Sequence, residues 1–266
     1  MFSVSHLRRL PALSAACCAA VLSGCAGLTE ETAPPVRLTY VTSFSGNEAS
    51  DRLPQGWQAW TLSRFKRPTE YRLVTENGAT VVRARASSSA SGLVHPLDVD
   101  PALYRLLQWR WKVEQLIPGA DNTRKSTEDS PVRIVISFAG DTEKLPFDDR
   151  LFFDQIKMFT GQQLPYATLM YIWENRAPRE SIIPNPHTSR IKMVVAESGR
   201  EKLGRWQNEM RDVYADFKRA FGEEPGRITA IAIMTDTDNT GENVHAYYGD
   251  MEFKQPPRSR NMPPRE

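Results

Sequence analysis

The acidic segment 236–242 carries the densest group of side chains that could hold a metal ion. Its candidate ligands, which would all present oxygen atoms, are Asp236, Asp238 and Asn239, with the more distant Asp250 as a fourth. Oxygen ligands followed by a glycine suit a hard cation, so a structural Ca²⁺ is one expectation here. The match to a helix-flanked calcium loop is partial, because Tyr247 stands where a bidentate glutamate belongs. The alternative is an Asp- and Asn-rich turn between two strands.

Tryptophan side chains form a second group, because exposed aromatic rings can stack on sugar rings. Trp109 and Trp111 alternate with polar residues in an apolar strand pattern, which favours a place in the core. Other tryptophans lie in loop-like or strand-end contexts, where a sandwich presents binding residues. We therefore expect a ligand site formed by Trp57, Trp173, Glu174 and Arg176. Trp60 belongs to the same group of tryptophans but is not assigned to that site.

Support for catalysis is weak. A glycoside hydrolase needs two carboxylates, and Glu174 with Asp154 or Asp236 could supply them. Because the chain has 32 acidic residues, such a pair can always be found. The sequence contains no nucleophile-elbow or zinc-protease motif. Binding is therefore favoured over catalysis.

The elements that would position these residues follow a period of two, which is typical of strands. The predicted strands cover 71–74, 79–84, 107–113, 132–138, 169–173, 191–195, 228–234 and 247–253. Asn77-Gly78 predicts a tight hairpin between the first two. Segment 228–234 is apolar on both faces, as expected of a central strand. We expect a mostly β protein, a jelly-roll type β-sandwich with one or two packed α-helices.

Two segments have helical spacing of apolar residues instead. The first is 148–159. The second is 201–221, where an aromatic and aliphatic stripe recurs every three or four residues before Gly222 and Pro225 stop it. The second helix should pack across one end of the sandwich, although it could instead bind a partner.

The first 24 residues have the layout of a secretory signal, with Arg8 and Arg9 before a short apolar run. Leu22-Ser-Gly-Cys25 resembles a bacterial lipobox, which implies lipidation of Cys25 after cleavage. Residues 25–35 then form a lipidated tether, 36–254 the β-sandwich domain, and 255–266 a proline-rich disordered tail. Ala26, in place of an aspartate, implies the outer membrane, facing the periplasm, in a Gram-negative cell.

Charge and cysteine content exclude several classes of protein. The full chain has 34 basic and 32 acidic residues, and removal of the signal takes away two arginines and no acid, which leaves no net charge. No run of Lys or Arg exceeds two residues, so we expect no nucleic-acid partner. All three cysteines lie within the first 25 residues, so the mature domain has no disulfide and no cysteine-based site.

Several motifs in the C-terminal half resemble the DUF3047 family of bacterial proteins of unknown function. They include Leu203-Gly-Arg-Trp206, Phe221-Gly-Glu-Glu-Pro225, the segment 231–241 and Tyr247-Tyr-Gly-Asp-Met-Glu-Phe253. The resemblance covers about residues 38–254 and implies no activity. The final strands are also similar to the end of galactose-binding-like jelly rolls, many of which hold a structural Ca²⁺. Gly249-Asp250 departs from the two acids that those modules usually carry there.

Together these features predict a membrane-anchored envelope lipoprotein that binds a glycan or related ligand without catalysis. One alternative is a polysaccharide-active enzyme that uses paired carboxylates. Another is a structural or assembly lipoprotein that binds a second envelope protein.

Overall fold

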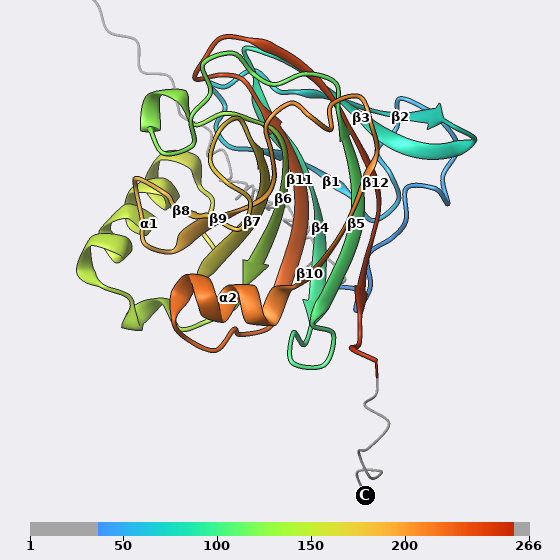
Figure 1. The fold of residues 1–266 in the computed structure, drawn as a ribbon. Helices are drawn as coiled ribbons and strands as arrows, with labels where there is room; N and C mark the ends of the chain where they lie inside the picture. The colour runs from blue at the N-terminus through green and yellow to red at the C-terminus, as the bar shows by residue number, and fades with distance from the viewer. Residues whose placement is uncertain (1–36, 258–266) are drawn as a thin grey trace, which may run out of the picture. The chain divides into compact units, whose positions relative to one another are not determined.

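A computed structural model describes residues 37–257, which belong to one compact unit. The expected signal, Cys25, the tether and residues 258–266 lie outside the described residues. The unit is a sandwich of a seven-stranded and a five-stranded sheet (Figure 1). The larger sheet, in spatial order, contains β1 (Gln58–Thr61), β4 (Ala90–Val99), β11 (Ile228–Asp236), β6 (Ser130–Phe138), β7 (Ala167–Glu174), β9 (Ile191–Ser198) and β8 (Ile182–Pro184). The smaller contains β10 (Gln207–Asp212), β5 (Leu106–Val113), β12 (Asn243–Lys254), β3 (Ala79–Ser87) and β2 (Glu70–Glu76). The predicted jelly-roll type sandwich is confirmed.

Alternating apolar residues of the two sheets meet in the core. Trp109 on β5 stacks on Tyr171 of β7, with ring centroids 5.0 Å apart. Trp111 lies beside Trp173, with a centroid distance of 6.4 Å, and all four rings are buried. The placement of Trp109 and Trp111 in the core is therefore confirmed. Burial of such large side chains supplies much of the stabilisation of a domain without disulfides.

Local sequence signals explain several elements. Asn77 and Gly78 both adopt positive φ, 51° and 79°, in the tight turn between β2 and β3. That conformation suits a two-residue hairpin, as predicted. Strand β11 lies between β4 and β6, which confirms the central position expected from its two apolar faces.

The first predicted helix is confirmed as α1 (Phe147–Thr160). The second prediction, 201–221, is wrong in its first half. Residues Gln207–Asp212 form β10 on the edge of the smaller sheet, and α2 (Val213–Phe221) begins only after Asp212, whose side chain caps it. Trp206 and Met210 are four residues apart, which places them on one face of a helix and also on one face of a strand. Their spacing therefore fits either element. Pairing with β5 decides for the strand.

Helix α2 packs on its own domain. Its buried Val213 and Phe217 belong to the main core, and the Phe217 ring lies 4.5 Å from that of Phe138. In the part of the chain that is described, no helix is both long and apolar enough to cross a membrane.

Candidate functional site

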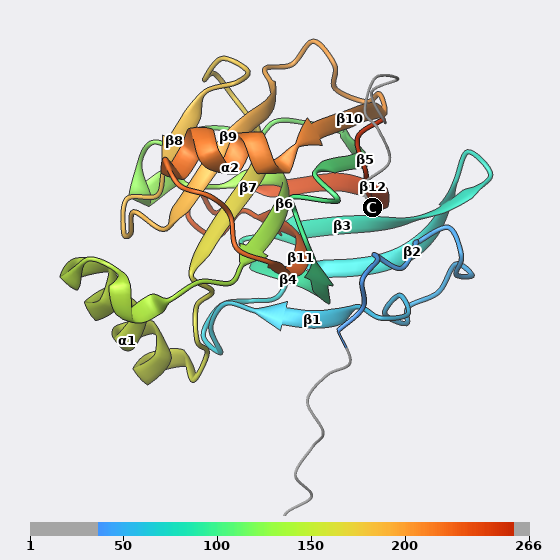
Figure 2. The ribbon, with the colours of Figure 1, turned by 90° about the horizontal axis from the view of Figure 1, so that it is seen from below.

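A hollow of about 520 Å³ lies on the outer face of the seven-stranded sheet. Outward side chains of the central strands form its apolar floor: Val94, Val135, Met170, Ala232 and Met234. Phe152 and Ile156 of α1 form one wall. The five-stranded sheet lies on the side of the unit away from α1 (Figure 2). We call this hollow the groove.

Trp60 lies at one end of the floor, and its position depends on a glycine. Trp60 of β1 is paired with Gly92 of β4, and a Cβ atom at position 92 would lie 2.8 Å from Cε3 of the indole. The missing side chain therefore lets the ring lie over the β4 backbone. Trp60 is half-buried, so part of the ring remains available to a ligand in the groove.

Arg133 lies farther along the same transverse row. The register runs from Trp60 through Gly92 and Met234 to Arg133. Three strand spacings of about 4.8 Å each separate the two ends by roughly 14 Å. A stacking ring and a charged group therefore mark the two ends of one row.

A buried ion pair forms the polar end of the groove. Nε and Nη2 of Arg133 donate to the two carboxylate oxygens of Asp236 at 2.9 and 3.0 Å, and the Ser130 N–H donates to the same carboxylate. Arg133 is 2% exposed, and Asp236 is 4% exposed. Burial raises the pKa of Asp236 to about 6, although the Arg133 guanidinium opposes the rise.

Two more carboxylates lie beside this pair. One oxygen each from Asp129, Asp236 and Asp238 lies within 4.8 Å of the others. Asp129 accepts hydrogen bonds from the N–H groups of Asn239 and Thr240, which fixes the loop after β11. Asp238 pairs with Lys66 at 2.6 Å.

The expected Ca²⁺ has a partial fit to this cluster. Three carboxylates offer the oxygen chemistry that Ca²⁺ prefers. However, Arg133 and Lys66 already neutralise two of them, so the ion would have to share both. Nδ2 of Asn239 donates to the Glu128 carbonyl, and its Oδ1 is the atom that would ligate an ion. Calcium binding stays a prediction.

Asp250 was expected in the same site, and the structure places it elsewhere. Its Oδ1 accepts hydrogen bonds from the N–H groups of Phe44 and Ser45, at 2.6 and 2.9 Å. The carboxylate therefore fastens the N-terminal segment to β12, outside the cluster of three.

Trp57 and Trp173 do not present rings to solvent, contrary to expectation. Trp57 is 4% exposed and packs on Phe44, while its Nε1 donates to the Thr42 carbonyl. Trp173 is fully buried, and its Nε1 donates to the Gly199 carbonyl. The strand-end position of Trp173 misled the prediction, because its side chain points between the sheets.

Glu174 is also buried, and its carboxylate accepts hydrogen bonds from backbone N–H groups. Its Oε2 accepts from the N–H groups of Arg176 and Ala177, and its Oε1 accepts from that of Asn122. This arrangement shapes the turn after β7. Arg176 is exposed on that turn, and neither residue lines the groove.

The sequence interpretation missed Trp60, Asp129 and Arg133 as site residues. Trp60 carried a usable signal, since it is a tryptophan four positions after Gly56 of the preceding turn. Arg133 carried another, because it is a charged residue within an otherwise apolar strand. Asp129 carried none, since its role depends on contact with Asn239 and Thr240, more than a hundred residues away.

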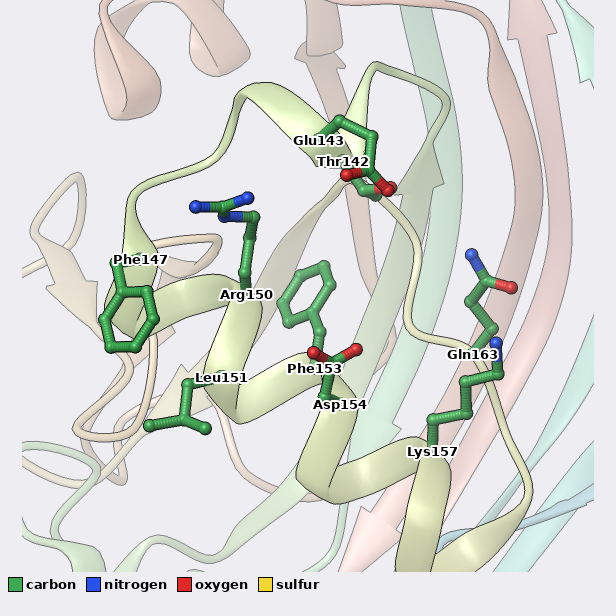
Figure 3. A pocket seen from close by; sticks show the side chains of 9 residues that line it. All are labelled: Thr142, Glu143, Phe147, Arg150, Leu151, Phe153, Asp154, Lys157 and Gln163. Carbon is green, nitrogen blue, oxygen red and sulfur yellow. The ribbon is translucent and has the colours of Figure 1, made fainter.

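A second cavity of about 310 Å³ lies between α1 and the segment around Thr142. Figure 3 shows Glu143, Arg150, Asp154 and Lys157 around it. Its positive and negative side chains balance, which gives it no clear ligand preference. Asp154 lines this cavity while Glu174 is buried against backbone, so the two do not form the carboxylate pair considered for hydrolysis.

Comparisons with solved structures give low similarity. The glycoside hydrolase domain of Endo-D from Streptococcus pneumoniae is 9% identical, with 74% of this chain and 21% of that chain covered and a TM-score of 0.34. An exo-β-agarase is 11% identical, with 84% and 25% covered and a TM-score of 0.33. The family 11 xylanase from Neocallimastix patriciarum is 9% identical, with 81% and 96% covered and a TM-score of 0.31.

The chain thus spans only about a quarter or less of the first two structures. No curated protein matches the sequence. The family model "Protein of unknown function (DUF3047)" matches residues 55–252. That range includes β1 through most of β12, and with it Trp60, Arg133 and the acidic loop. The chain therefore belongs to the DUF3047 family.

Proposed function

We propose that this protein binds a segment of a glycan in the groove and does not alter it chemically. The observation that carries the proposal is the groove itself, which has a volume of about 520 Å³. Its floor is apolar, with Trp60 at one end and the Arg133–Asp236 pair at the other. Binding sites for organic ligands commonly combine such a floor with a few convergent polar groups.

The lining chemistry suits a sugar chain. A half-buried indole offers an apolar face to a pyranose ring. Polar side chains suited to hydroxyl groups line the remainder: Gln162, Gln163, Asn185, His187 and Asn239. The row from Trp60 to Arg133, roughly 14 Å long, has room for a few sugar rings.

Hydrogen bonding supports binding over hydrolysis. A general acid must reach the glycosidic oxygen with a free carboxyl group. Both oxygens of Asp236 accept from Arg133, and both oxygens of Asp129 accept from the Asn239–Thr240 segment. All four oxygens of these two carboxylates are therefore engaged in hydrogen bonds that stabilise the fold.

The test uses the full chain with Cys25→Ser, which removes the expected acylation site. Retention on a panel of neutral polysaccharides and the appearance of new reducing ends would be followed in the same samples. We expect retention without new ends, and at least about tenfold weaker retention for Trp60→Ala. Phe65→Ala is the matched control, since Phe65 is an exposed aromatic residue on the next loop that does not line the groove.

Each outcome is decisive. New reducing ends would replace the proposal by the enzyme alternative. Equal retention of both variants would remove the groove as the binding site. Absence of retention on every glycan, together with a co-purifying envelope protein, would favour the assembly alternative.

We also propose that Cys25 anchors the protein to the bacterial envelope, which would place the groove near envelope glycans. Two or more acyl chains make such anchoring stable. Metabolic labelling with radioactive palmitate should mark the wild-type protein and leave Cys25→Ser unlabelled. Labelling of the Cys25→Ser protein would contradict this assignment.

A further inference from the structure

The outer face of the five-stranded sheet gathers cationic side chains that the groove does not use. Arg72 on β2 is directly opposite Arg83 on β3, Arg83 is opposite Tyr247 on β12, and Tyr247 is opposite Lys112 on β5. Arg85 and His245 form the neighbouring cross-strand pair, and Arg110 lies two residues before Lys112. We call Arg72, Arg83, Arg85, Arg110 and Lys112 the basic face.

The arrangement works against stability. Like charges directly opposite each other on neighbouring strands repel, yet Arg72 and Arg83 occupy such a pair. Arg72 is compensated in part by Asp51 and Glu70, and Lys112 is compensated by Glu76 and Glu114. Among residues 37–257, Arg83, Arg85 and Arg110 form no ion pair with a carboxylate. The Nε atom of Arg83 is inaccessible to solvent and has no hydrogen-bond partner in the same part of the chain. An anion above this row would reduce the repulsion and pair with the arginines that lack a carboxylate partner.

Aromatic rings hold the cations in place. The Arg110 guanidinium lies 4.7 Å from the Trp206 ring centroid, and the Lys112 ammonium lies 4.2 Å from that of Tyr247. Gly249 makes room for Arg110, because a Cβ atom there would lie 2.4 Å from its Cγ. These contacts reduce the freedom of long side chains that would otherwise lose entropy on binding a ligand.

We propose that the basic face binds an anionic polysaccharide, with its carboxylate or sulfate groups on Arg83, Arg110 and their neighbours. Strand spacing sets Arg72 and Arg83 roughly 5 Å apart, and Arg83 and Lys112, with Tyr247 between them, roughly 10 Å apart. A pyranose residue in an extended chain advances by about one strand spacing, so acidic sugars one or two residues apart can meet successive cations. Of the side chains on this face, only Met210 is a large and highly exposed apolar group, which argues against insertion into a bilayer. This site is separate from the groove and does not depend on it.

The charge pattern also explains why the sequence did not reveal this face. Its cations come from three different strands and are separated by core residues, so no Lys or Arg run marks them. Strand pairing alone brings them together. The expectation of no nucleic-acid partner relied on the absence of such runs, so single-stranded DNA belongs in the test.

The test would measure binding of the full chain carrying Cys25→Ser to polygalacturonate and heparin, with dextran as a neutral reference. We expect binding to both acidic chains, and loss of that binding when salt rises from about 0.1 M to about 1 M, where the screening length falls to roughly 3 Å. Arg85→Gln/Arg110→Gln should weaken binding about tenfold. Arg64→Gln/Arg150→Gln is the matched control, because both arginines are exposed, lie on the loop after β1 and on α1, and form no ion pair within 37–257.

Trp60→Ala separates this proposal from the groove proposal, because it should leave binding to acidic chains unchanged. Equal binding by the two arginine double variants would overturn the basic-face assignment. So would binding only to single-stranded DNA or to anionic vesicles of phosphatidylglycerol. Thermal unfolding of each variant would show that the fold is retained, and the exposed positions of Arg85 and Arg64 favour that result.

Discussion

Glu209 on β10 and Glu197 on β9 form a buried contact between the two sheets, and it should make stability depend on pH. The two side chains are 7% and 2% exposed. Lys202 pairs with Glu197 at 2.6 Å, whereas the nearest cation to Glu209 is Arg179, at 4.0 Å. Oε1 of Glu209 has no hydrogen-bond partner among the described residues. Burial, followed by the repulsion of Glu197, raises the pKa of Glu209 to about 7.

The sign of the effect follows from proton binding. The folded protein holds this proton more tightly than the unfolded chain, whose glutamate has the ordinary pKa of 4.5. Well below that value both states are protonated, so the group contributes no dependence of stability on pH. As pH rises towards 7 the unfolded chain releases its proton first, so the free energy of unfolding falls. At about 1.4 kcal/mol per pKa unit, the loss amounts to up to about 3 kcal/mol.

Glu209→Gln should remove this component, because an amide keeps the shape and carries no charge. Urea unfolding at pH 5, 6, 7 and 8 would measure it as the difference between the wild-type and variant curves. We expect the free energy of unfolding of the variant to increase relative to wild type from pH 5 to about pH 7, and the difference to level off by pH 8. Glu252→Gln is the control, since Glu252 is 68% exposed beside Lys254 and should run parallel to wild type. Parallel curves for Glu209→Gln would refute the reasoning.

Three further outcomes follow from the groove. Arg133→Met leaves the Asp236 carboxylate buried without its partner and should cost about 3–5 kcal/mol in urea unfolding; a loss below about 1 kcal/mol would contradict the importance of the pair. Gly92→Ala places a methyl group 2.5 Å from the Ile233 carbonyl and 2.8 Å from Trp60. We therefore expect weaker glycan retention and a free energy of unfolding lower by about 1–3 kcal/mol. Unchanged retention would show that the position of the Trp60 ring is unimportant. Arg133 and Lys66 already neutralise two of the three carboxylates in the acidic cluster, so the Asp- and Asn-rich turn predicts equal thermal midpoints in Ca²⁺ and in chelator, whereas the calcium interpretation predicts a midpoint lowered by chelator.

Strand periodicity predicted most of the sandwich, and its failures have local causes. Strand β4 was missed because Gly92 and Pro96 are typical of turns. The structure tolerates Pro96 where the register of β11 shifts between Ile228 and Ala230, so the missing N–H falls at an irregularity of the ladder. Strand β10 was predicted as part of a helix, because the spacing of residues 206 and 210 fits the helical period of about 3.6 as well as the strand period of about 2. Only pairing with β5 distinguishes them.

The candidate site was predictable in its acidic loop and not in its partners. Asp236 and Asp238 were recognisable from their spacing after an apolar strand. Arg133 reaches Asp236 because β6 lies beside β11 in the sheet, a neighbour relation that a single sequence does not contain. The same reason hides the basic face. Trp173 was wrongly included in the site, because a tryptophan at a strand end can point to either side of a sheet and this one points inward.

The hydrogen bonds from Asn239 and Thr240 to Asp129 have a kinetic consequence. They fix the backbone at the polar end of the groove through contacts within the protein itself. A ligand arriving there meets a preorganised rim and does not have to order a loop, so little conformational entropy is lost. Association should then proceed at similar rates for different ligands, and selectivity among them would reside in how long each remains bound.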